Sequence, residues 1–500
     1  MAAVSTAALE TDQYYTWGRP LADATAALNA KINLEIRRVL DAAEASRPGN
    51  PPACPAIARE LRSRLHFGII QPIEIWATHS PLVPRLPATP ADELAFRRTD
   101  LYGNHGPFDI GRSVPDSPTV EVGGVRFGTD KLSHFFSSGW RYYLKYHAAK
   151  ARGLSDEQAQ EAAIHWGIIE ERTVTGLLVD GVFARGDLEA NFGGMRFYLN
   201  LCEGPDPMVA LEANRWKVRR PFDWREYETP GWDEAYHVSI YSASRWEKVR
   251  PRLQEYCGRR DDPEAVARLD TYRASYPPSS SDRAVALLVH DGTLSDPSQF
   301  TLDENCPAVA TGQPQPRTDR PAPDERPRNG APETSPPQGG EEALMGDIAS
   351  READQQQRVY SLASARYSSL QGLAGSVGWL FTNVESDFDC RTMCDLRGPT
   401  VQLQPGGNGG QLSVGYARIF GETDHYERFL VTPYLALGIR GVLLRTWRDG
   451  YLGPAGQTFL GTEGQFTIIR VAFTLGVLRH AGGASARHEW AFSSGIGWGF

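Results

Sequence analysis

The sequence predicts a multidomain chain with a mainly α-helical N-terminal domain, a disordered proline-rich linker and a C-terminal antiparallel β-barrel of about eight strands. Three observations lead to this fold class. Apolar residues recur at helical spacing in the first part of the chain, the segment 307–340 contains nine prolines, and the residues after it alternate between apolar and small or polar side chains. A chain of 500 residues is also too long for one ordinary hydrophobic core, so we expect at least two domains.

The composition narrows the function classes. A hydrophobic content of 41% and a charged content of 23% are typical of folded protein. The net charge of −9 and the lack of a long basic run argue against nucleic acid as a partner. No window of about 18 apolar residues is present, so the sequence predicts no transmembrane helix. A membrane β-barrel stays open, because its strands are short and alternate in polarity.

Shifts in composition set the expected domain boundaries. Residues 1–12 contain small side chains of the type found around a signal cleavage site, but no basic or apolar segment precedes them, so a signal-peptide remnant and a frayed terminus both stay open. We assign 13–306 to the helical domain, 307–356 to the linker and 357–500 to the barrel. The linker lacks the apolar surface that would offset chain entropy, so we expect it to be disordered and to tether the two halves.

Capping residues and apolar spacing predict the elements of the helical domain. Residues 120–127 are typical of a short hairpin with Gly123-Gly124 at its turn, and Thr129 follows in a position to cap the next helix. Ser155 and Gln158 have the spacing of a capping box for the helix after that. The predicted helices span about 21–39, 57–65, 130–150, 156–178, 187–201 and 243–256.

After the linker the hydrophobic period changes from 3.6 to 2. In 373–381, Leu, Val, Trp and Phe alternate with Ala, Ser and Gly, and similar alternation recurs in 411–416, 431–440 and 469–477. Small side chains fit the interior of a narrow barrel of about eight strands, and the apolar face would then meet lipid. The barrel must close, because lipid cannot satisfy the polar groups of an open edge. A soluble antiparallel β-domain is the alternative.

The last residues of the chain carry the most specific pattern. Ser493, Gly495, Trp498 and Phe500 form a polar-x-Gly-x-x-aromatic-x-aromatic ending on the final residue. This ending resembles the β-signal of bacterial outer-membrane proteins. The resemblance implies an outer-membrane location, with outer-membrane lipid and the barrel assembly machinery as partners. We expect Trp498 and Phe500 both to face lipid.

The number and positions of the cysteines indicate whether the protein resides in an oxidising compartment. Cys390 and Cys394 lie close together in a polar segment, and we predict a small disulfide between them in a loop of the barrel. The helical domain holds an even number of cysteines, which fits disulfides in an oxidising compartment, although reduced thiols stay open. Their pairing is not evident from the sequence; they are Cys54, Cys202, Cys257 and Cys306.

Polar residues in three predicted helices form a candidate site. Asp130 and His134 are four residues apart and share one helix face, where a carboxylate can orient an imidazole. Glu171 interrupts an apolar stretch in the next helix, where a charge needs a partner. Asp187 and Asn191, again four apart, share a face of the third helix. Antiparallel packing of the helices would bring these side chains together around His134.

The string of these residues resembles the VanZ-like and YfiM-like bacterial envelope families over about residues 127–200. The matching positions are Asp130, Lys131, His134, Phe135, Glu171, Asp180, Gly181, Asp187, Asn191 and Gly194. VanZ-like proteins are membrane-embedded and linked to glycopeptide resistance. The helix from Asp130 departs from them because it carries Arg141, Lys145 and Lys150 and cannot span a bilayer. The YfiM-like periplasmic form is therefore the closer comparison, and it brings no assigned reaction.

Each candidate residue also has a structural interpretation. Asp187 can be a helix N-cap, His134 can be an interior histidine with satisfied hydrogen bonds, and Glu171 can pair with Arg172 or Arg141. The functional interpretation is a polar pocket that performs acid/base chemistry. The sequence commits to no cofactor, and a divalent metal stays open.

Together these features predict a bacterial envelope protein in which an outer-membrane barrel anchors a helical periplasmic domain. A structural or binding role is the leading hypothesis, with the cell wall as a further candidate partner. The alternative is an envelope hydrolase or a lipid- or glycan-modifying enzyme that uses the pocket. Whether the chain is an enzyme stays open at this point.

Overall fold

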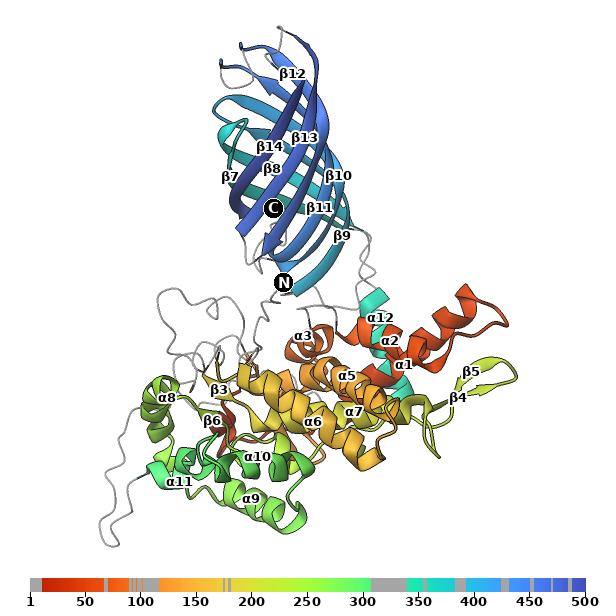
Figure 1. Cartoon of the computed structure of the whole chain (residues 1–500), viewed down its shortest axis with the longest axis vertical. Helices are drawn as coiled ribbons and strands as arrows, with labels where there is room; N and C mark the ends of the chain where they lie inside the picture. Colours follow the sequence, from red (N-terminus) through yellow and green to blue (C-terminus); the bar gives the residue numbers. More distant parts are fainter. Residues whose placement is uncertain are drawn as a thin grey trace, which may run out of the picture. The chain divides into compact units, whose positions relative to one another are not determined.

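The computed structural model divides the chain into two compact units, one ending at Met345 and one spanning Gly346–Phe500 (Figure 1). The residues that the structure describes are 11–66, 71–89, 92, 96, 101, 117–173, 176–178, 181–306, 340–353, 358–382, 393–423, 431–449, 454–468, 471–483 and 488–500.

The first unit is mainly helical, as the sequence predicts. Its described helices are α1 (Thr25–Ser46), α2 (Cys54–Leu65), α3 (Pro72–His79), α5 (Asp130–Lys150), α6 (Asp156–Thr173), α7 (Arg185–Cys202), α8 (Ala243–Glu255), α9 (Pro263–Ser275), α10 (Ser280–His290) and α11 (Leu302–Asn305). A further helix, α12 (Glu341–Ala353), begins in the first unit and ends in the second. Three small antiparallel sheets accompany them, formed by β1 (Thr119–Val122) with β2 (Val125–Gly128), β3 (Val182–Phe183) with β6 (Ile240–Tyr241), and β4 (Val209–Glu212) with β5 (Arg215–Val218). Within the described residues, no helix combines the length and apolar character needed to cross a membrane.

The hairpin of β1 and β2 leads directly into α5. Gly123 and Gly124 form its turn with φ of +57° and +87°, values that favour glycine at both positions. The expected cap by Thr129 is wrong. Its backbone is already helical, with φ −63° and ψ −19°, so its side chain makes no capping bond and its Oγ1 lies 3.2 Å from Thr78 Oγ1 instead. α5 nevertheless begins at Asp130, as predicted.

The capping box that opens α6 is confirmed. Ser155 N donates to Gln158 Oε1 at 3.0 Å, and Gln158 N donates to Ser155 Oγ at 3.2 Å. α6 ends at Thr173, earlier than the predicted residue 178. The chain turns back over the helix end there, since Leu177 N donates to the Glu171 carbonyl at 2.7 Å. A Cβ on Gly176 would lie 2.0 Å from that same carbonyl oxygen, so this turn requires glycine.

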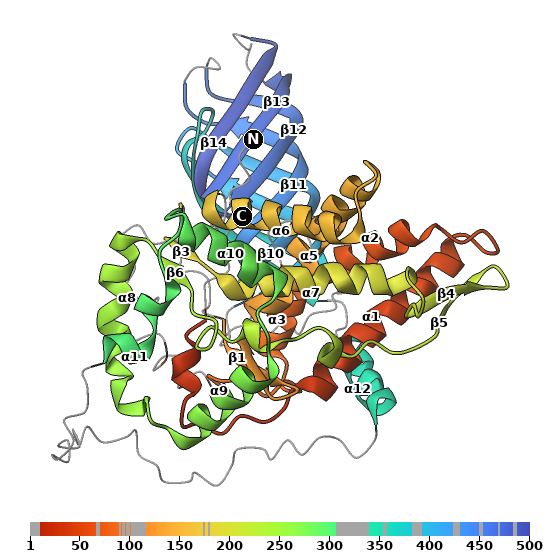
Figure 2. The same cartoon turned by 60° about the horizontal axis from the view of Figure 1, so that its bottom comes forward.

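Helices α5, α6 and α7 form the part of the first unit that carries the candidate site (Figure 2). α5 and α7 cross at Gly139 and Gly194, where a Cβ on Gly139 would lie 2.6 Å from Gly194 Cα. A Cβ on Gly194 would lie 1.9 Å from the Phe135 carbonyl oxygen. The two glycines therefore let the backbones approach closely. Beside this crossing, Phe135 packs against Phe197, Trp224 and Trp232.

Two disulfides are present among the described cysteines. Cys54 pairs with Cys202, with Cα atoms 6.1 Å apart, and Cys257 pairs with Cys306, with Cα atoms 5.5 Å apart. The even number of cysteines thus corresponds to disulfides, and the structure supplies the pairing. The expected Cys390–Cys394 disulfide lies outside the described residues, because Cys390 and the side chain of Cys394 are not described.

The second unit contains a closed antiparallel barrel in which each strand pairs with its neighbours in sequence. Its strands are β7 (Arg358–Ser368), β8 (Gly372–Thr382), β9 (Met393–Pro405), β10 (Gly409–Thr423), β11 (Val431–Thr446), β12 (Gln457–Ile468), β13 (Val471–Gly483) and β14 (Trp490–Gly499). The barrel closes where β14 pairs with β7, from Gly495 opposite Ser368 to Gly499 opposite Ser364. The predicted eight-stranded barrel is therefore confirmed.

The two faces of the strands follow the predicted alternation. In β8, for example, Ala374 and Ser376 are buried, whereas Leu373, Val377 and Trp379 are 72%, 56% and 47% exposed. The barrel interior is less uniform than expected, because an apolar cluster lies near each end. One cluster is Tyr360, Leu362, Leu380, Leu396, Ala417, Ile419, Ala436 and Phe500, and the other is Leu370, Val442, Leu444, Phe459, Leu478 and Ala491.

The expectation that Phe500 faces outward is wrong. Trp498 is 57% exposed, but Phe500 is only 3% exposed and belongs to the first apolar cluster. Gly499 has a φ of +93°, which breaks the alternation of the strand and turns the last side chain inward. A Cβ on Gly438 would lie 2.7 Å from the Phe500 ring, so this glycine leaves room for the ring inside the barrel.

The expected linker differs from the structure at its end. α12 occupies Glu341–Ala353, within the segment 307–356 for which we expected disorder. Leu344 and Met345 are buried, so the helix has more apolar anchoring than its polar composition suggested. Glu341 also accepts a hydrogen bond from Asn33 Nδ2 at 2.7 Å. The proline-rich part, 307–339, lies outside the described residues, as do residues 1–10 of the expected terminal segment.

Candidate functional site

The five candidate residues from the sequence lie together in the first unit. α5 supplies Asp130 and His134, α6 supplies Glu171, and α7 supplies Asp187 and Asn191. All except His134 are buried, with at most 4% of each residue exposed. The glycine crossing of α5 and α7 explains why their i, i+4 pairs meet.

A buried lysine stands at the centre of the carboxylates. Lys131 is fully buried, and its Nζ lies 2.6 Å from Asp130 Oδ2 and 2.7 Å from Asp187 Oδ1. It also contacts the carboxylate of Glu234, which follows the 3₁₀ helix Pro230–Trp232. Thr11 Oγ1 lies 3.1 Å from Asp130 Oδ1. The ammonium therefore neutralises part of a buried acidic group and holds Asp187 through one of its two oxygens.

The His134 imidazole bridges the two polar residues of α7. Its Nε2 lies 3.2 Å from Asp187 Oδ2, and its Nδ1 lies 3.3 Å from Asn191 Oδ1. The His134 side chain is 18% exposed, compared with 5% for Asp187 and none for Lys131. His134 is therefore the member of this group through which solvent reaches the site.

Glu171 faces the same position from α6. Burial raises the pKa of its carboxyl well above the usual value, and the nearby charges of Asp187 and Glu170 act in the same direction. Arg141 forms an ion pair with the neighbouring Glu170. The ligand atoms of His134, Glu171 and Asp187 all lie within 4.8 Å of one another.

The structure also decides between interpretations of Asp187. The N-cap of α7 is Ala184, so Asp187 lies inside the first turn, where the helix dipole favours a carboxylate. Its two oxygens contact Lys131 and His134 instead of capping the backbone. The N-cap interpretation of Asp187 is therefore wrong.

The sequence reasoning missed three participants. Lys131 was part of the motif but was not assigned to the site, and nothing in the sequence pointed to Glu234. Glu74 on α3 was also missed; it accepts hydrogen bonds from Ser117 Oγ at 2.7 Å and Ser133 Oγ at 2.5 Å. Burial, together with the charge of Asp130, raises the pKa of Glu74 to about 7. The sequence does contain a sign that Lys131 is buried. The apolar residues Leu132, Phe135 and Phe136 follow it on α5.

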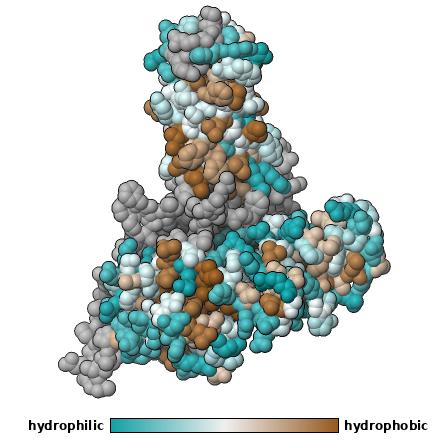
Figure 3. All heavy atoms as spheres, in the orientation of Figure 1, coloured by the Kyte–Doolittle hydropathy of each residue, from teal (hydrophilic) through white to brown (hydrophobic). Residues whose placement is uncertain are grey.

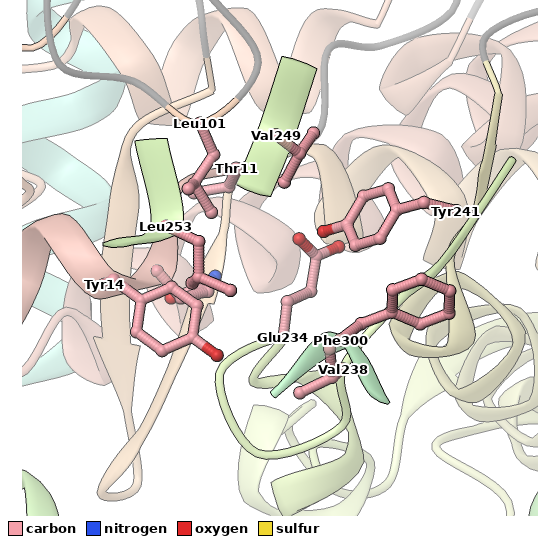
Figure 4. A pocket seen from close by; sticks show the side chains of 10 residues that line it. Thr11, Tyr14, Leu101, Glu234, Val238, Tyr241, Val249, Leu253 and Phe300 are labelled. Carbon is pink, nitrogen blue, oxygen red and sulfur yellow. The ribbon is translucent and has the colours of Figure 1, made fainter. Parts of the chain in front are cut away.

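A small cavity borders the acidic group on the side of Glu234. In Figure 4 the Glu234 carboxylate points into this cavity toward the Tyr241 phenol, between largely apolar walls. The lining residues are Thr11, Gln13, Tyr14, Leu101, Glu234, Val238, Tyr241, Val249, Leu253 and Phe300. Thr11 and Glu234 thus connect the cavity with Asp130 and Lys131, but His134 does not line it.

Among the described residues, two groups of side chains have the spacing to hold a metal ion. One is His134 with Glu171 and Asp187, and the other is Asp130 with Asp187 and Glu234. Lys131 contacts all three carboxylates of the second group and already supplies a cation there. The first group combines an imidazole with two carboxylates, which suits either acid/base chemistry or metal binding.

No protein-family model, curated protein or solved structure matches this chain. The resemblance to VanZ-like and YfiM-like proteins therefore rests on the motif residues alone. Of these, Asp180 lies outside the described residues, and Gly181 forms a turn with φ +75°. The remaining motif residues line the contact of α5 with α6 and α7, which gives their spacing a common structural reason.

Proposed function

We propose that this chain is an integral outer-membrane protein of a bacterial envelope, in which the barrel anchors the helical unit on the periplasmic side. One observation carries the proposal: every strand of a closed barrel exposes large apolar side chains on its outer surface. Examples are Tyr367 on β7, Leu475 on β13 and Phe492 on β14, which are 65%, 72% and 73% exposed. Figure 3 shows such side chains gathered on the visible face of the barrel.

The contrast with the helical unit supports a membrane environment. Among the described residues, large apolar side chains are exposed at seven positions in the first unit and at twenty-three in the second, although the second unit is shorter. In water this barrel surface would cost on the order of 20 kcal/mol, at ~1 kcal/mol for each half-exposed side chain. Lipid removes that cost, and a closed barrel leaves no unpaired strand edge in the bilayer.

The filled interior favours an anchor over a pore. Between the two apolar clusters, Glu463 binds Arg366 and Arg440 inside the barrel. Side chains thus occupy the interior at both ends and in the middle, as expected for a barrel of about eight strands. This supports the proposal of a structural or binding role for the chain, and we propose lipid and the barrel assembly machinery as its partners.

The pairing of the first and last strands indicates on which side of the membrane the helical unit is attached to the barrel. Ser364 of β7 lies opposite Gly499 of β14, so the barrel begins and ends at the same rim. β7, the strand that follows the helical unit in the sequence, begins at that rim. In bacterial outer-membrane barrels with an even number of strands the two chain ends share one side, which we assign to the periplasm.

A matched pair of tryptophans on β14 tests the anchor. Trp498 and Trp490 are 57% and 53% exposed, but only Trp498 belongs to the terminal motif. We expect Trp498→Ala to reduce outer-membrane insertion several-fold, measured by membrane fractionation and by heat-modifiable migration on gels. Trp490→Ala should insert nearly normally. Full-length protein in the soluble fraction, or equal insertion of both variants, would contradict the proposal.

A second candidate function is an envelope hydrolase or a lipid- or glycan-modifying enzyme. The convergence of His134, Asp187 and Glu171 at a partly exposed edge favours it, because a histidine held by a carboxylate can act as a general base. The test is product analysis after incubation of the full-length protein with isolated envelope lipids and cell wall. His134→Ala should abolish product formation, whereas the surface variant His147→Ala should not.

A further inference from the structure

We infer that His134, Glu171 and Asp187 bind one divalent transition-metal ion, for which Zn²⁺ is the best match. The site uses one ligand from each of α5, α6 and α7, so the ion would join three helices of the first unit. The inference does not depend on where the barrel resides.

The positions of the ligand atoms fit such an ion. His134 Nε2 and Asp187 Oδ2 are 3.2 Å apart, and ligands at ~2.1 Å from one ion and about 100° apart lie at about this distance. The ligand atoms of all three side chains lie within 4.8 Å of one another, a spacing that one shared ion can bridge. Three protein ligands leave a fourth position for water or substrate, on the side where the 18% exposed His134 meets solvent.

The hydrogen bond of the second imidazole nitrogen supports a ligand role. His134 Nδ1 faces Asn191 Oδ1 at 3.3 Å, and a carbonyl oxygen can only accept. Nδ1 therefore carries a proton, and Nε2, which lies 3.2 Å from Asp187 Oδ2, is the nitrogen placed to bind a metal ion. Metal-bound histidines characteristically donate their other N–H in this way.

Lys131 explains why the ion belongs to this group and not to its neighbour. Its ammonium contacts Asp130, Glu234 and Asp187 Oδ1, so it fills the cation position of the neighbouring carboxylates. Asp187 Oδ2 is left for the His134 side. Lys131 thereby orients a metal-binding carboxylate through its other oxygen, as outer-shell partners do at metal sites.

The chemistry of the three donor side chains indicates which metal ion fits best. The donor set of one imidazole and two carboxylates is harder than a thiolate site and softer than an all-oxygen site, which favours Zn²⁺ over Mg²⁺ or Ca²⁺.

The test uses the full-length protein, purified in detergent, stripped with a chelator and titrated with ZnCl₂ against a chromophoric competitor. We expect one Zn²⁺ per chain and no comparable binding of Mg²⁺ or Ca²⁺. His134→Gln and Glu171→Gln should each lower the affinity at least tenfold. X-ray absorption of the wild-type Zn²⁺ complex should show a single imidazole ligand, and this measurement does not depend on a variant that folds.

The controls come from a second histidine–glutamate pair near the other ends of α5 and α7. His147 Nε2 lies 3.3 Å from Glu203 Oε1, and both side chains are partly exposed. His147→Gln and Glu203→Gln should leave Zn²⁺ affinity unchanged. Wild-type protein without stoichiometric Zn²⁺, a spectrum without an imidazole ligand, or equal loss of affinity in the His134 and His147 variants would each overturn the inference.

Discussion

The two units bury charged clusters of opposite character. In the barrel, the single carboxylate of Glu463 accepts hydrogen bonds from Arg366 at 2.6 Å and from Arg440 Nε at 3.1 Å. Neutral amides and hydroxyls complete the cluster, among them Gln402, which accepts from Arg440 at 2.5 Å, and Ser493, which donates to Glu463 at 3.1 Å. In the helical unit, one ammonium serves several carboxylates, and one histidine reaches solvent.

The difference shows how a structural cluster can be told from a reactive one. The barrel cluster has more cationic than anionic side chains, is closed off at both ends by apolar residues and has neutral polar neighbours. It has little capacity to take up another ion. The helical cluster combines several carboxylates with one ammonium and has a partly exposed edge at His134, where we propose that a metal ion binds. Net charge and access, more than burial, separate the two.

The largest effect is expected from Lys131→Met, which removes the cation that three buried carboxylates share. Breaking a buried ion pair by removing one partner typically costs about 3–5 kcal/mol, and we expect a loss in this range for the helical unit. Chemical unfolding followed by near-ultraviolet circular dichroism measures it. Lys150→Met, at a surface pair on the same helix, is the control and should change stability little. If Lys131→Met changes the stability of the helical unit only a little, the carboxylates do not depend on this ammonium, and the proposed contrast with the barrel cluster is wrong.

A pH-dependent effect is expected from Glu74, whose pKa burial raises from 4.5 to about 7. The pKa is higher in the folded than in the unfolded state, so protonated Glu74 contributes to the free energy of unfolding. This contribution is fully present below pH 4.5 and is lost as the pH rises to about 7. The loss amounts to about 3 kcal/mol for a shift of this size. Unfolding at pH 4.5, 6 and 7.5 should show this slope in the wild type and a shallower one in Glu74→Gln. Equal slopes would mean that Glu74 ionises normally.

A somewhat smaller effect is expected from Glu463→Gln in the barrel. Glutamine keeps one acceptor oxygen for the arginines but leaves two guanidinium groups buried without a counter-charge, so we expect a loss of about 2–3 kcal/mol. Urea unfolding in lipid vesicles, followed by heat-modifiable migration, measures it. Glu489→Gln, at the exposed pair with Arg479, should be nearly neutral. If Glu463→Gln is neutral as well, the barrel cluster does not hold the strands together.

The smallest effect is expected from Gly194→Ala at the crossing of α5 and α7. The new Cβ would lie 1.9 Å from the Phe135 carbonyl oxygen, so the helices must separate at a cost of about 1–2 kcal/mol. Gly193→Ala is the matched control, since its Cβ would meet Trp232 at 3.2 Å, and it should cost less. Thermal unfolding of the two variants compares them. A Gly194→Ala protein as stable as the wild type would show that the crossing tolerates separation.

The sequence by itself determined which faces the residues occupy. Alternation in 373–381 identified the outward and inward faces of β8, and the i, i+4 spacings placed Asp130 with His134 and Asp187 with Asn191. Such periodicities are properties of a single element, so they can be read without knowing its neighbours. The convergence of these side chains was a hypothesis that needed only the ordinary packing of consecutive helices.

The tertiary structure alone decided which faces meet and what fills the space between them. Glu234 lies 103 residues after Lys131, and no spacing in the sequence signals their contact. Phe500 turned inward because the φ of +93° at Gly499 ended the strand alternation, a backbone choice that the aromatic pattern does not encode. α12 formed within a polar segment because burial of Leu344 and Met345 outweighs the low hydrophobicity around them. In each case the stabilising contacts are made with residues distant in sequence. Only the folded chain brings those residues together.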